Sequence, residues 1–288
     1  MFYTQKFNTM MDFYNFITTA PNNKTFHGEN DSETNSEDFT GTKDFKQAAE
    51  LFVNGWDSGI AAINSCGHDF SAPANKAIVR NYYVGGSPNV ARAMQGLPDS
   101  MRQVYRVPQK QKVLTLFVDM CVAARVNRKR YMECGRYLYQ AVREIERQGT
   151  RVQIITGFAD RIDGKPELII CPEIVLKRAS ESIDAGRLSF ALAHMGMFRR
   201  LGFKYIETCP APDLNNDKAK NYSPWGYGKV AISDEKVKAK FEQKVKKDYK
   251  YAACVYMQEL CNNSDLTSGE KMVDTIKEAA KNDERKRN

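Results

Sequence analysis

The stretch VLTLFVDM at residues 113–120 decides the fold of this chain, because an apolar run of strand length ends there in an aspartate. Two segments follow it, YMECGRYLYQAVREIERQG (131–149) and RVQIITG (151–157). The first has the apolar spacing of an amphipathic helix, and the second has the composition of a buried strand. The pattern predicts a strand at 113–118, a helix at 129–148 and a strand at 151–157, which is the order of an α/β core.

The next segment, RIDGKPELIICPEIVLK at 161–177, is expected to turn back on the preceding strand. Asp163-Gly164 is a turn signal between apolar strands, so it predicts a hairpin of 151–158 with 167–176. A link this short permits only antiparallel strands. A helix at 184–201 and a strand at 203–208 are predicted to follow. The chain is therefore expected to contain a Rossmann-like α/β sheet with one antiparallel strand and flanking helices.

The regions on either side of this core are expected to be mainly helical. Apolar spacing favours helices at 3–20 and 43–54, and KAIVRNYYV at 76–84 alternates as an edge strand does. Ser87 is expected to cap a short helix in which Pro88 takes the first position.

Near its end the chain is strongly basic. KVKAKFEQKVKKDYK at 236–250 predicts a basic helix over 234–248 that continues through YAACVYMQELC, and a last amphipathic helix is expected at 265–282. We therefore expect a helical or irregular N-terminal region that packs on the core at 1–108, an α/β core at 109–232 and a basic helical extension at 233–288.

Composition narrows the function classes. The chain has 288 residues, 42% of them hydrophobic, a net charge of +8 and seven cysteines without a C-x-x-C pair. No apolar run approaches the ~20 residues that span a bilayer, and the first residues lack the pattern of a signal peptide. We expect a cytoplasmic protein with reduced thiols and no membrane partner.

The order of predicted elements resembles the von Willebrand factor A family. In that family the first strand ends in D-x-S-x-S, whose oxygens help to hold a divalent metal. The matching residues here are Asp119, Cys121 and Ala123. Hard cations prefer oxygen ligands, so the resemblance implies a degenerate site without metal, and no cofactor is expected. Asp119 could instead cap the next helix or pair with an arginine.

Three blocks carry a second resemblance, to an uncharacterised protein family found largely in tailed bacteriophages. They are FTGTKDFKQAAELFVNGW (39–56), GGSPNVARAMQGLPDSM (85–101) and IDAGRLSFALAHMGMFRRLGF (183–203). This resemblance implies a setting, the cytoplasm of an infected bacterial host, but no activity.

Two hypotheses for function remain open, and an enzyme is the weaker third, because no catalytic constellation is evident. The first is a non-enzymatic protein that binds a phage or host protein, with an interaction loop of Tyr222, Trp225 and Tyr227. The second is a protein that binds DNA or RNA backbone through basic side chains. The candidate residues are Arg125, Arg128, Lys129, Arg130, Lys236, Lys240, Lys244 and Lys247.

Overall fold

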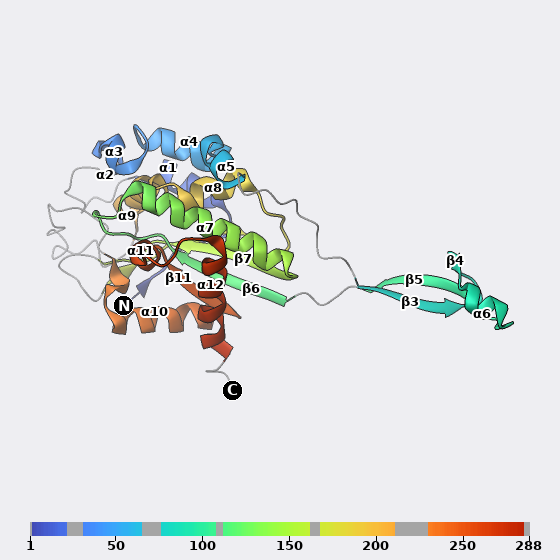
Figure 1. Ribbon diagram of the computed structural model, residues 1–288. Helices are drawn as coiled ribbons and strands as arrows, with labels where there is room; N and C mark the ends of the chain where they lie inside the picture. Colours follow the sequence, from blue (N-terminus) through green and yellow to red (C-terminus); the bar gives the residue numbers. More distant parts are fainter. Residues whose placement is uncertain are drawn as a thin grey trace.

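The computed structural model describes residues 2–21, 31–64, 76–107, 112–161, 168–210 and 230–284. They form a mixed α/β body and a projecting segment that lies apart from it (Figure 1). The body is built on a five-stranded sheet in the order β11-β6-β7-β10-β2. These strands are β11 (Ala252–Tyr256), β6 (Lys112–Asp119), β7 (Thr150–Gly157), β10 (Glu173–Lys177) and β2 (Lys6–Phe7).

Strand directions confirm the central part of the predicted sheet. β6 pairs in parallel with both β7 and β11, and β10 runs antiparallel to β7. β2 pairs in parallel with β10 at the edge. The sheet thus takes strands from all three regions expected from the sequence. A small second sheet joins β1 (Phe2–Tyr3), β9 (Ile169–Ile170) and β8 (Asp160–Arg161).

Helices cover both faces of the five-stranded sheet, because each face buries apolar side chains. In β6, Leu116 and Val118 enter the larger core, whereas Phe117 enters the smaller one, as alternation along a strand requires. α10 (Glu235–Asp248) covers the smaller core with Phe241 and Val245 (Figure 1). The helices that contribute to the larger core include α1 (Met10–Thr19), α4 (Phe45–Asn54), α7 (Arg128–Arg147), α8 (Ala185–Ala193), α11 (Met257–Asn262) and α12 (Gly269–Glu284).

Helix α7 confirms the helix predicted after the first strand. Its buried face follows helical spacing, with Tyr131, Cys134, Leu138 and Val142 fully covered. The Asn127 side chain accepts a hydrogen bond from the Lys129 amide and so caps the helix.

The strand predicted at 203–208 is wrong, since Phe203–Thr208 forms helix α9 directly after a π-helical turn, Met197–Gly202. The helical backbone continues through Gly202, whose φ is −64°. A Cβ there would come within 2.9 Å of the Phe198 ring, so the glycine permits close packing. The large side chains of α9 are held by tertiary contacts, including Tyr205 against Phe7.

A strand that was not predicted, β11, pairs with β6 and lies within the segment expected to continue the basic helix. α10 ends at Asp248, and Tyr251 adopts a positive φ of 53°, which a continuing helix cannot accommodate. Every residue of β11 is buried. Burial on both faces explains why the strand reads as a continuous apolar run.

The projecting segment, residues 76–107, is called the arm. Its strands β3 (Lys76–Tyr82) and β5 (Met101–Val107) form an antiparallel ribbon, with Lys76 paired to Val107. The predicted cap at Ser87 is wrong, because Ser87–Pro88 forms strand β4 against β5. The short helix α6 (Val90–Met94) begins only after Asn89.

Candidate functional sites

Asp119 lies at the carboxyl end of β6 and is completely buried. Its Oδ1 accepts hydrogen bonds from the Cys121 amide (3.1 Å) and the Ala159 amide (3.0 Å), whereas Oδ2 has no hydrogen-bond partner. Burial raises the pKa of Asp119 to about 7, although the two amide bonds favour the charged form. The side chain therefore fixes the loop that follows β6. It does not cap α7, whose cap is Asn127.

This position does not fit a divalent cation. One oxygen of Asp119 is occupied by two amides, Ala123 has no side-chain donor, and burial raises the pKa of the Cys121 thiol well above its usual value. The residues that the structure describes contain no group of three His, Cys, Asp or Glu side chains that could hold a metal ion. Weak metal binding by Asp119 remains a prediction.

The basic segment after this loop divides into two parts. Arg125, Arg128 and Lys129 are exposed and line one cavity of about 440 Å³. Arg130 instead donates hydrogen bonds to main-chain carbonyls that follow α11, at Asn263 (2.5 Å) and Leu266 (3.0 Å). The structure thus brings three of the four predicted residues together, while Arg130 ties α7 to the C-terminal region.

Two neighbouring arginines have roles that sequence reasoning missed. Arg199 is 3% exposed and donates to carbonyls of the loop after β6, at Ala123, Ala124 and Val126 (3.1–3.2 Å). Arg200 is fully buried. It donates to the carbonyls of Ser32, Glu33, Asn35, Thr42 and Lys43. The carbonyls that accept from Arg199 and Arg200 lie more than 70 residues away along the chain. The local sequence therefore indicates only two cations near the end of a helix.

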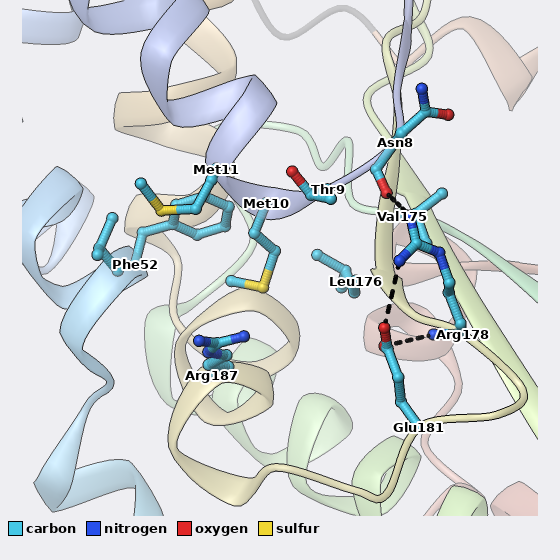
Figure 2. A pocket seen from close by; sticks show the side chains of 11 residues that line it. Asn8, Thr9, Met10, Met11, Phe52, Val175, Leu176, Arg178, Glu181 and Arg187 are labelled. Carbon is cyan, nitrogen blue, oxygen red and sulfur yellow. Dashed lines mark hydrogen bonds and ion pairs between the residues drawn. The ribbon is translucent and has the colours of Figure 1, made fainter.

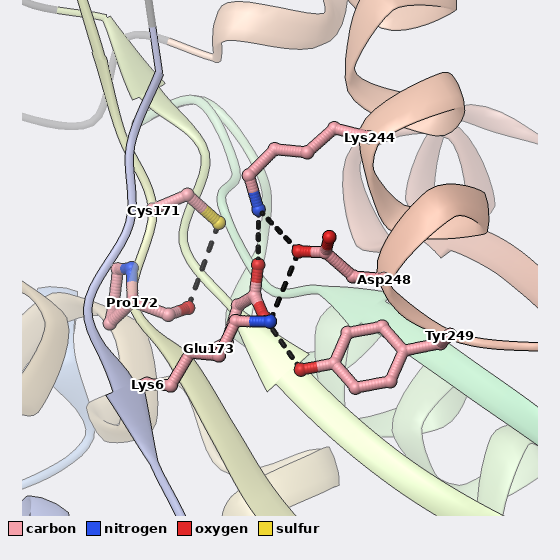
Figure 3. Close-up of polar contacts among 7 residues, drawn as sticks. All are labelled: Lys6, Cys171, Pro172, Glu173, Lys244, Asp248 and Tyr249. Carbon is pink, nitrogen blue, oxygen red and sulfur yellow. Dashed lines mark hydrogen bonds and ion pairs between the residues drawn. The ribbon is translucent and has the colours of Figure 1, made fainter.

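The predicted lysine row of α10 is interrupted. Lys236, Lys240 and Lys247 are exposed. Lys244 is half-buried, and its ammonium group binds the buried carboxylate of Glu173 (Figure 3). Burial lowers the pKa of Lys244, but the hydrogen bond to Glu173 and nearby carboxylates outweigh it, and the pKa rises. Lys244 therefore anchors α10 to the sheet.

Further contacts around Glu173 complete this anchor. The Tyr249 hydroxyl donates to Glu173 Oε2 (2.6 Å), and the Lys6 ammonium lies 3.4 Å from the same oxygen (Figure 3). Lys6 also donates to Asp248 (3.0 Å). Because the buried carboxylate is fully engaged, this cluster joins β2 near the N-terminus and the end of α10 to strand β10.

A smaller cavity, of about 120 Å³, lies beside α1 and β10 (Figure 2). Its polar wall is occupied by internal contacts, since Arg178 pairs with Glu181 and donates to the Asn8 carbonyl. Met10, Phe52 and Leu176 form much of the rest. The predicted interaction loop with Tyr222, Trp225 and Tyr227 lies outside the described residues.

The arm has a surface unlike that of the body. No residue from 79 to 105 is buried, and neither core includes a described side chain of the arm. Eleven large apolar or aromatic side chains are exposed in the described part of the chain, and eight of them lie on the arm. These are Val79, Tyr82, Tyr83, Val84, Val90, Met94, Leu97 and Val104.

The arm is also basic. Its only acidic residue is Asp99, which is paired with Arg92. The other four basic residues are Lys76, Arg80, Arg102 and Arg106. The exposed apolar side chains therefore stand on a positively charged ribbon.

Comparison with known proteins gives a family but no activity. No curated protein and no solved structure matches the chain. No described helix is long and apolar enough to cross a membrane. One family model, for a domain of unknown function named DUF7192, matches residues 2–279, a range that includes both the body and the arm. The chain therefore belongs to the DUF7192 family.

Proposed function

We propose that this protein is a non-enzymatic binding protein, and that its arm is the element that contacts a phage or host protein. The observation that carries the proposal is the exposure of eight large apolar or aromatic side chains on an arm without a core. Val79 and Val104 are direct partners across β3 and β5, and a concentration of exposed apolar side chains is typical of interaction sites in soluble proteins.

The body supports a scaffold role in this proposal. The proposal is supported by the succession β6, α7, β7 and an antiparallel β10, which is the order of elements on which the resemblance to the von Willebrand factor A family rests. The aspartate at the end of β6 accepts hydrogen bonds from two main-chain amides. We therefore propose a von Willebrand factor A-like body that has lost metal chemistry and carries a binding arm.

The setting in this proposal is the cytoplasm of an infected bacterium. It rests on the three sequence blocks that resemble a tailed-bacteriophage family. Two of these blocks fall in the body, and the third, residues 85–101, lies within the arm.

The test is affinity purification of the tagged full-length protein from phage-infected bacteria, with and without nuclease. Val84→Ser and Met94→Ser, at arm positions that are 79% and 84% exposed, should reduce recovery of a defined partner at least tenfold. Val113→Ser and Met11→Ser change the same residue types at exposed positions of the body and should leave recovery unchanged. Equal loss with both pairs, or a nuclease-resistant partner retained by the arm variants, would contradict the proposal.

A second candidate function, binding of nucleic acid, is favoured by the charge of the arm. Two antiparallel strands such as β3 and β5 fit the major groove of duplex DNA, and proteins that bind the minor groove combine basic side chains with inserted apolar ones. The ribbon offers Arg80 and Arg102, which are exposed. Nuclease-sensitive recovery of DNA or RNA, with affinity that falls steeply between low and moderate salt, would favour this function over the first.

A further inference from the structure

The cavity lined by Arg125, Arg128, Lys129 and Arg199, which we call the basic pocket, lies where α/β sheets place their ligands. β6 leads through α7 to β7 on one side, whereas β11 lies on the other side of β6. The connections diverge at the carboxyl end of β6, which makes this end a topological switch point. The loop between β6 and α7 forms one wall of the pocket there.

Three side chains from different elements hold this loop in place. Asp119 accepts from the Cys121 amide, and Gln258 Oε1 accepts from the Ala123 amide at 2.7 Å. Arg199 binds the carbonyls of the same loop and also that of Phe39, at 2.9 Å, while its guanidinium stacks on the Phe39 ring. The basic side chains beyond the loop therefore project from a fixed main chain.

The pocket carries an excess of positive charge. Asp38 is the one carboxylate among its lining residues, against four cations. No contact between Arg125, Arg128, Lys129 or Arg199 and a described carboxylate meets the distance of an ion pair. Burial lowers the pKa of Arg199 to about 10, so it remains a cation at neutral pH.

The start of α7 also favours an anion. This 20-residue helix begins at Arg128, in the pocket, and a helix N-terminus carries partial positive charge, although the Asn127 side chain already caps the Lys129 amide. A volume of about 440 Å³ lies within the usual range for small-molecule sites.

We infer that the basic pocket binds the phosphate group of a small phosphorylated molecule. A tetrahedral dianion offers several oxygens, which match the forked donors of two exposed arginines and the point charge of a lysine. The edge that holds a metal cation in von Willebrand factor A-type sheets would thus hold an anion in this chain. This inference concerns the body and does not depend on the arm.

The test is calorimetric titration of the full-length protein with pyrophosphate, followed by the triple variant Arg125→Gln/Arg128→Gln/Lys129→Gln. All three side chains are exposed, so the variant should fold, which circular dichroism checks. We expect the wild-type protein to bind one pyrophosphate, with at least tenfold weaker binding in the variant. A matched variant, Lys236→Gln/Lys240→Gln/Lys247→Gln on α10, removes the same charge elsewhere and should bind as the wild type does.

A second arm of the experiment distinguishes a small phosphorylated ligand from a nucleic-acid backbone. A short oligodeoxynucleotide without terminal phosphates carries only phosphodiesters and should compete poorly with pyrophosphate. Absence of pyrophosphate binding, equal weakening by the two triple variants, or full competition by the oligonucleotide would each overturn the inference.

Discussion

The body and the arm belong to one chain but differ in how far their apolar side chains are buried. The body buries apolar residues on both faces of its sheet, under α10 on one side and several helices on the other. The arm buries none of its described side chains from 79 to 105. Backbone pairing alone gives a small ribbon little stability. The function of the arm is therefore expected to be contact with another molecule.

The first prediction compares two aromatic truncations and has the largest expected effect. Phe117→Ala removes a fully buried ring that packs on Phe241 in the smaller core. It should lower the free energy of unfolding by about 3–5 kcal/mol. Tyr83→Ala removes a ring on the arm that is 73% exposed, and it should change the free energy of unfolding by less than about 0.5 kcal/mol. Urea unfolding measures both, and similar losses would show that the arm contributes to the folded body.

A second comparison uses two arginines. Arg200→Met leaves several buried carbonyls without a donor and should lower the free energy of unfolding by about 3 kcal/mol. Arg102→Met, on the arm, should leave the free energy of unfolding nearly unchanged. Arg200→Met should also release the segment from Ser32 to Lys43, measured as faster amide hydrogen exchange there. Unchanged exchange would argue that packing alone holds that segment.

The third prediction concerns pH and the buried Asp119. Its folded-state pKa of about 7 lies above the unfolded value of about 3.9, so between these values the native state binds a proton that the unfolded chain lacks. This contribution to stability is present below pH 4 and is lost as pH rises through 7. Asp119→Asn should remove this pH dependence of stability. The free energy of unfolding of the variant should therefore rise by about 2–3 kcal/mol relative to that of the wild type as the pH rises from 5 to 8. Parallel pH profiles for the two proteins would show that the carboxylate stays ionised.

The smallest effect is expected on α10. Lys240→Glu and Lys247→Glu alter exposed side chains and should change stability by less than about 0.5 kcal/mol. Lys244→Met leaves the buried Glu173 with fewer donors and should cost more, about 1–3 kcal/mol. If the two exposed changes abolished salt-dependent nucleic-acid binding, α10 rather than the arm would be the contact surface.

By itself, the sequence determined the elements whose residues sit in a strong local pattern. The apolar run of β6 and the helical spacing of α7 could be predicted because they depend on periodicity. The antiparallel direction of β10 and β7 was also predicted, but the turn signal Asp163-Gly164 lies outside the described residues, and Ile169–Ile170 of the expected hairpin pairs with β1 and β8 rather than with β7. Arg125, Arg128 and Lys129 were evident as a basic segment, although their shared cavity was not.

Only the tertiary structure decided the elements whose partners lie far along the chain. Residues 203–208 were predicted as a strand and 252–256 as part of a helix, yet the first segment is helical and the second is a strand paired with β6. Arg199 and Arg200 are anchors because distant carbonyls surround them. Long-range packing overrides local preference at such positions, since burial and satisfied polar groups contribute more than propensity does.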